Sequence, residues 1–225
     1  MLFTAFYLLF LSSTAFASAI PAASFSALSS RQAGTSAASM LLVIAPTSGS
    51  CAGAPAAGEC ATNVDAAPYL IKAMSNYAIT SPHEIAAVLS LIAFESGDFK
   101  YNINHYPAPG RPGQGTRNMQ MANYNLMYAQ AIPALASQLS AITTATSTSG
   151  LSDDQLNAIR ALVLPDEYSF ASGAWFLTTQ CASARPAIQA GGQAGYSAYL
   201  SCVGTSATAD RLAYWTRANT ALGIA

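Results

Sequence analysis

Glu95 is the residue of this sequence whose type and position best suit acid–base chemistry. It continues an apolar series at Ile85, Val88 and Ile92 in steps of three and four, so on a helix its carboxylate shares the core-facing side. Burial and the negative end of the helix dipole both disfavour the charged form, which predicts the raised pKa that a general acid needs. The alternative is a helix that ends at Phe94 and leaves Glu95 turned to solvent.

A long loop rich in glycine, asparagine and aromatic residues follows Glu95 and extends to about residue 118. Aromatic rings stack on sugar faces, and side-chain amides bind hydroxyl and acetamido groups, so this combination is typical of carbohydrate recognition. A loop of this length inside a compact domain is more often functional than not. The alternative is an ordered surface loop whose tyrosines pack locally.

The segment Ile92-x-x-Glu95-Ser96-Gly97, with Asn118-Met119-Gln120 about twenty residues later, resembles the lysozyme-like superfamily, above all lytic transglycosylases and goose-type lysozymes. Further segments resemble the plant-type (family 19) chitinases: Gly113-Gln114-Gly115, Asn123-Tyr124-Asn125, Ala174-Trp175-Phe176, Gly191-Gly192 and Asp210-Arg211-x-x-Tyr214. The resemblance covers roughly residues 65–222 and rests on the order and spacing of short motifs.

The resemblance implies a single lysozyme-like helical domain with a long cleft loop. The implied function is a secreted glycoside hydrolase or lytic transglycosylase that cleaves β-1,4-linked N-acetylhexosamine polymers, chitin or peptidoglycan. Glu95 would be the general acid, and Asp98 is the nearest second acidic residue. The residues expected to bind the polysaccharide or oligosaccharide substrate are Ser96, Tyr101, Asn102, Asn104, Arg117, Asn118, Met119, Gln120, Asn123 and Tyr124.

The position of Asp98 leaves the activity open, although we lean towards an enzyme. An inverting pair of carboxyl groups needs a separation of ~6.5–9.5 Å, and Asp98 follows Glu95 by only three residues. The alternative is a non-catalytic lysozyme-fold protein that binds cell-wall oligosaccharides.

The elements that must position these residues are helices. Helical periodicity begins near residue 62 and no alternating strand pattern appears, which predicts an all-α single domain. Capping boxes are expected at Ser81–Glu84, with Pro82 at the first helical position, and at Ser152–Gln155. Helices are expected over 65–77, 82–96, 121–141 with a disturbance at Pro133, 152–164, 166–180, 192–203 and 208–222.

The composition excludes several classes of function. Charged residues make up 8% of the chain and the net charge is −1, so the basic stripe of a nucleic-acid-binding protein is missing. No phosphate loop, dinucleotide fingerprint or calcium loop appears, so the sequence implies no cofactor and no metal. We expect a monomer.

The N-terminal region predicts export. Leu2 to Leu11 is almost wholly apolar, and Ala15-Phe16-Ala17 follows as a cleavage pattern, so residues 1–17 read as a signal peptide. The alternative, a membrane anchor, is disfavoured because a spanning helix needs ~20 apolar residues. A Ser/Ala-rich lead-in or propeptide is then expected over 18–50 and the helical domain over 51–225, in a secreted, extracellular protein with no membrane contact after signal removal.

Four cysteines, Cys51, Cys60, Cys181 and Cys202, are an even number and favour two disulfides in a secreted chain. Three pairings can be drawn, and the clustering in sequence favours Cys51–Cys60 and Cys181–Cys202. A zinc site is the weaker alternative, because the chain has no Cys-x-x-Cys and neither histidine neighbours a cysteine.

Overall fold

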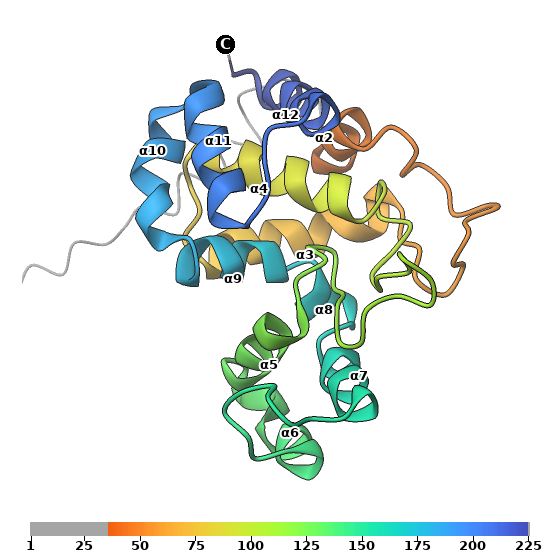
Figure 1. Ribbon diagram of the computed structural model, residues 1–225. Coiled ribbons are helices and arrows are strands. Elements are labelled where there is room, and N and C mark those ends of the chain that lie inside the picture. Colours follow the sequence, from red (N-terminus) through yellow and green to blue (C-terminus); the bar gives the residue numbers. More distant parts are fainter. Residues whose placement is uncertain (1–35, 225) are drawn as a thin grey trace, which may run out of the picture.

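Helix α4 (Pro82–Glu95) runs through the centre of the molecule and carries Glu95 as its last residue (Figure 1). Every residue from Glu84 to Ala93 is buried, because α2, α9, α10 and α12 all pack against it. A helix that is buried all round must be apolar on all its faces, and the segment from Ile85 to Ala93 is, apart from Ser90. The central helix therefore delivers its last carboxyl group to one end of the core.

The computed structural model describes residues 36–224. Within this range the chain is helical, and its only β-type pairings are isolated bridges in the loop after α4, which confirms the all-α single-domain prediction. No helix in the described range is long and apolar enough to cross a bilayer. The elements besides α4 are α2 (Ala37–Ile44), α3 (Asn63–Asn76), α5 (Ala122–Gln130), η1 (Pro133–Leu135), α6 (Ala136–Ile142), α7 (Asp153–Leu162), α8 (Asp166–Ser169), α9 (Ser172–Thr179), η2 (Ala182–Ala184), α10 (Arg185–Ala190), α11 (Gly192–Cys202) and α12 (Ala209–Leu222).

Helix α2 lies inside the segment predicted as a lead-in over residues 18–50. The side chain of Ser36 accepts a hydrogen bond from the backbone N–H of Ser39 and so caps the helix. The helix buries Met40, Leu41 and Ile44 and packs against α12 and α3. The packed domain therefore extends beyond the predicted boundary at residue 51, while the predicted signal peptide over 1–17 lies outside the described residues.

Local signals explain most helix starts. The reciprocal capping box predicted at Ser152 and Gln155 is confirmed. The box predicted at Ser81 is wrong, because Ser81 makes no side-chain cap and Glu84 turns into the core to meet Arg185. The charged, two-point contact with Arg185 replaces the bond that this carboxylate would make to the N-terminal amides.

The predicted helix over 121–141 is broken at Pro133 as expected, into α5, η1 and α6. These elements and α7 lie together at the end of the molecule opposite α12 (Figure 1). The single helix predicted over 166–180 is instead divided into α8 and α9, and α10 was not predicted.

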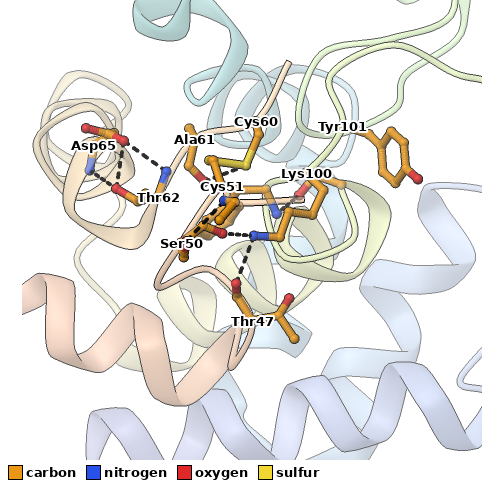
Figure 2. Close-up of a disulfide and its surroundings, with 12 residues drawn as sticks. Thr47, Ser50, Cys51, Cys60, Ala61, Thr62, Asp65, Lys100 and Tyr101 are labelled. Atoms are coloured by element: carbon orange, nitrogen blue, oxygen red, sulfur yellow. Dashed lines mark hydrogen bonds between the residues drawn. A yellow bond between two sulfur atoms is a disulfide. The ribbon is translucent and has the colours of Figure 1, made fainter. Parts of the chain in front are cut away.

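Both predicted disulfides are confirmed. Cys51–Cys60 closes the exposed segment between α2 and α3, with Cα atoms 5.8 Å apart (Figure 2). Cys181–Cys202 joins the end of α9 to the end of α11, with Cα atoms 5.9 Å apart. One disulfide therefore holds a loop and the other joins two helices.

Candidate functional site

A cleft of about 340 Å³ opens where the C-terminal end of α4 meets the loop over residues 96–121. A volume of this size suits a small organic ligand. The lining residues are Glu95, Tyr101, Ile103, Asn104, His105, Tyr106, Gln114 and Met119. The cleft therefore offers hydrogen-bonding groups and apolar surface to the same ligand.

Glycines give the loop its shape. Gly115 forms a bridge with Ile103, and a Cβ atom on Gly115 would come within 2.7 Å of the carbonyl oxygen of Asn102. Gly110 has a φ of +100°, and a Cβ atom there would overlap the carbonyl oxygen of Asn104. Glycine at these positions lets two separate parts of the loop form one cleft wall.

Glu95 lies between the core and the cleft. Its side chain is 25% exposed, and Arg211 of α12 donates a hydrogen bond from Nη2 to Glu95 Oε1 over 3.1 Å. Burial raises the pKa of Glu95 above its ordinary value, and the charge and hydrogen bond of Arg211 only partly oppose the rise. The predicted direction of the shift is confirmed. The alternative, a helix ending at Phe94 with Glu95 in solvent, is wrong.

Asp98 does not line the cleft. It is 4% exposed, and its Oδ2 accepts hydrogen bonds from the backbone N–H and the hydroxyl of Thr47, both over 2.8 Å. Its Oδ1 accepts a hydrogen bond from the Tyr214 hydroxyl over 2.7 Å. Asp98 thus connects the chain after α2 to α12, and both of its oxygens are occupied away from the cleft.

The other predicted binding residues divide into three groups. Those that line the cleft are Tyr101, Asn104 and Met119. Those that are buried within the loop are Ser96, Asn102, Arg117, Asn118 and Gln120. Asn123 and Tyr124 lie on α5, where Asn123 is exposed and the Tyr124 ring packs edge-on against Phe176.

The buried members shape the loop from within. Arg117 donates from Nη1 to the carbonyl oxygens of Phe99 and Tyr101, and its guanidinium lies over the Phe170 ring. Gln120 donates to Asn125, which donates to the carbonyl oxygen of Gly113. These side chains support the cleft rather than line it.

Sequence reasoning missed two charged residues of the site, Arg211 and Glu59. Glu59 lies next to Cys60 and binds the cleft wall through Asn102, Ile103 and His105. The scarcity of charge is the signal that could have found Arg211, because a buried acid in a chain with only 9 basic residues needs one of them nearby. The same signal does not point to Glu59, whose partners are two backbone N–H groups and His105. The predicted set also lacks four lining residues, Ile103, His105, Tyr106 and Gln114.

The chain is similar in sequence to a protein of known name. A Fusarium oxysporum (strain Fo5176) protein named bifunctional dioxygenase (DOX)-epoxy alcohol synthase (EAS) is 51% identical to this chain over 161 residues. The match covers 71% of this chain and 12% of the relative, so the chain spans a small part of the relative's length. No protein family and no solved structure matches the chain.

This relative contradicts the resemblance to the lysozyme-like superfamily and the functions that followed from it. At 51% identity the matched protein bears the name of an oxidative enzyme, so the assignment as a glycosidase or lytic transglycosylase is wrong. The alternative, a non-catalytic protein that binds oligosaccharides, is wrong for the same reason, and so is the predicted polysaccharide partner. Each misleading motif specifies only two to four residues, and such short matches recur by chance in a chain rich in Ala, Ser and Gly.

Oxygenases in general use a metal or an organic cofactor to activate dioxygen. The described residues do not fit a metal site, because they contain no group of three or more His, Cys, Asp or Glu side chains. All four cysteines form disulfides, and His105 in the cleft already contacts Glu59.

Proposed function

We propose that this chain is a ligand-binding module of an oxidative system that forms epoxy alcohols, and that its cleft holds the oxygenated molecule. The observation that carries the proposal is Glu95, a carboxyl group with a raised pKa that faces a cleft of mixed polarity. The name of the Fusarium relative supports the ligand class, since an epoxy alcohol synthase forms a molecule with an oxirane and a hydroxyl group.

The cleft suits an amphiphilic epoxy alcohol. Ile103, Met119 and the ring of Tyr106 offer apolar surface to a carbon chain. Glu95 and Gln114 also line the cleft and offer hydrogen-bonding groups to the oxygen atoms of the ligand. An epoxide oxygen is only an acceptor, so it needs a donor, and a protonated carboxyl group supplies one.

Glu95 is suited to donate because its pKa is raised. Burial favours the neutral form, whose O–H can donate to an epoxide or hydroxyl oxygen. The hydrogen bond from Arg211 goes to Oε1 and fixes the orientation of the carboxyl group. The second oxygen, Oε2, is then left to face the ligand.

We also propose that the protein is exported, as its N-terminal sequence predicts. Two disulfides in the described residues support this location, because disulfides persist in oxidising compartments.

Isothermal titration with an epoxy alcohol that carries an apolar chain tests the proposed binding. We expect wild-type affinity to be highest at low pH and to fall as the pH rises through the pKa of Glu95, because the anion cannot donate. Glu95→Gln retains a neutral donor and should bind with little pH dependence. Glu95→Ala should lose about 10-fold in affinity, as expected for one buried hydrogen bond.

The parent compound without the oxirane and hydroxyl groups is the matched ligand control and should bind more weakly. Equal affinity for the control ligand, or a wild-type affinity that rises with pH, would show that Glu95 does not bind the oxygen atoms as a donor.

A further inference from the structure

One wall of the cleft is the segment of residues 102–105. We infer that Glu59 is the positioning residue of this wall and that the Cys51–Cys60 disulfide holds Glu59 in place. This inference rests on the proposed function only in its ligand-binding readout, since the contacts themselves do not depend on which ligand the cleft takes. Glu59 lies outside α4 and its following loop, 36 positions before Glu95 in the chain.

The carboxylate of Glu59 binds three groups of the wall, on Asn102, Ile103 and His105. Its Oε2 accepts hydrogen bonds from the backbone N–H groups of Asn102 and Ile103, each over 2.9 Å. Its Oε1 lies 2.7 Å from Nε2 of His105. Ile103 and His105 line the cleft, so one carboxylate orients two of its lining residues.

The side chain of Glu59 is largely shielded, with 14% of its surface exposed. Hydrogen bonds to an ionised acceptor are about twice as strong as neutral ones, and shielding from water strengthens them further. Residues 102–105 have no helix or sheet to hold them, apart from the isolated bridge at Ile103. Glu59 therefore supplies order that regular secondary structure does not.

The segment that carries Glu59 has few other anchors. Most residues between Cys51 and Cys60 are exposed or half-exposed, so little apolar burial fixes their position. The disulfide joins the two ends of this segment directly beside Glu59. The covalent link therefore limits where the carboxylate can lie, and without it the segment gains much conformational freedom.

Two contacts connect the disulfide to the start of the cleft loop. Lys100 donates from Nζ to the carbonyl oxygens of Thr47 and Ser50, just before Cys51 (Figure 2). Ala61, just after Cys60, donates its backbone N–H to the carbonyl oxygen of Phe99 over 3.0 Å. The disulfide segment is thus fastened on both sides to residues that lead into the wall.

Three variants test the inference: Glu59→Ala, Glu59→Gln and the double variant Cys51→Ser/Cys60→Ser. Amide hydrogen exchange of Asn102 and Ile103, measured by NMR without ligand, reports on the wall itself. We expect protection to fall about 10-fold in Glu59→Ala and in the double serine variant. Glu59→Gln keeps an acceptor oxygen for the two amides, and its new N–H can donate to Nε2 of neutral His105, so it should retain most of the protection.

Affinity for the epoxy alcohol should follow the same order: wild type, then Glu59→Gln, then Glu59→Ala with a loss of about 10-fold.

The matched control for the exchange measurement is Cys181→Ser/Cys202→Ser, which removes the disulfide between α9 and α11. Measured well below its melting temperature, this variant should keep the exchange rates of Asn102 and Ile103 within about 2-fold of the wild type.

The inference is overturned if Glu59→Ala leaves both amides protected, or if the two double serine variants affect them equally. A failure of the proposed function looks different: the wild type would not bind the epoxy alcohol, while the exchange results would still follow Glu59. Partial rescue by Glu59→Gln separates positioning from general destabilisation, because all single variants keep both disulfides.

Discussion

The two ends of helix α4 each present a glutamate to an arginine, with opposite outcomes. Glu84, in the first turn, is 1% exposed and binds Arg185 through both oxygens, at 2.6 Å from Nε and 3.1 Å from Nη2. Glu95, in the last turn, is 25% exposed and receives a single hydrogen bond of 3.1 Å from Arg211. Arginine thus binds both carboxylate oxygens of the glutamate at one end of the helix and only one oxygen of the glutamate at the other end.

The helix itself contributes to this difference. Its N-terminal end favours a negative charge and its C-terminal end opposes one, so the helix dipole adds to burial in disfavouring the charged form of Glu95. At Glu84 every oxygen has a cationic partner, which suits a structural link between α4 and α10. Glu95 lines the cleft, Arg211 binds only one of its oxygens and its pKa is raised, which suits proton donation.

The largest effect should come from breaking the Glu84 pair. Glu84→Ala leaves Arg185 without its partner in the core, so we expect the free energy of unfolding to fall by about 3–5 kcal/mol in urea titrations. The double variant Glu84→Ala/Arg185→Met should recover part of this loss, because no unpaired charge is left. A loss below about 1 kcal/mol would mean that the Glu84–Arg185 pair stabilises the fold no more than the Glu95–Arg211 pair does.

A second test removes the disulfide nearest the Glu84 end. Cys181–Cys202 brackets α10, which carries Arg185, and Cys181→Ser/Cys202→Ser should lower the free energy of unfolding by about 2–4 kcal/mol. Hydrogen exchange should then speed up in α10 and the first turn of α4 more than in the last turn. If hydrogen exchange speeds up equally at both ends of α4, the two ends of this helix do not differ in their dependence on the disulfide.

At the Glu95 end, Arg211→Met removes the group that holds the pKa of Glu95 down. We expect the pKa of Glu95 to rise further, as followed by carboxyl ¹³C NMR, because desolvation is then unopposed. The stability cost should be only about 0.5–1 kcal/mol, since the pair is partly exposed. A lower pKa in the variant would mean that Arg211 does not act on Glu95 through its charge.

The smallest effect on stability should come from Glu95→Gln. A raised pKa means that the folded state binds this proton more tightly than the unfolded state, so the favourable contribution is complete below about pH 4.3 and is lost as the pH rises through the folded-state pKa. The glutamine variant does not lose this contribution. At pH 7 its free energy of unfolding should therefore equal that of the wild type or exceed it by up to about 1 kcal/mol.

Glu84→Gln, measured in the same way, is the matched comparison and should be destabilising at pH 7. A marked destabilisation by Glu95→Gln would instead make Glu95 a structural partner like Glu84.

Much of the helical layout could be predicted because its causes are local. Pro82, the Ser152–Gln155 box and the break at Pro133 act over a few residues of chain, and each lies where it was expected. The disulfide pairing followed from the closeness of each cysteine pair in sequence. Helix α2 was missed because its Ser/Ala-rich surroundings resemble a linker, and its helical state depends on packing against α12.

The site was predictable only in part. Steps of three and four along α4 were enough to place Glu95 towards the core and to give the direction of its pKa shift. The residue types of the loop also predicted a binding surface, yet five of the expected contacts are buried inside it. Residue type shows what a side chain can bind, and only the folded loop decides whether it faces a ligand or its own backbone.

The sequence by itself therefore determined most of the helices, the disulfides and the acid at the end of α4, because these depend on periodicity and short separations. Only the tertiary structure decided the partners of the charged groups. Arg211 lies 116 positions from Glu95 and Glu59 lies 43 positions from Asn102, and no local pattern encodes contacts over such distances. In a chain with so few charges, each pairing is set by which helix ends and loops the folded core brings together.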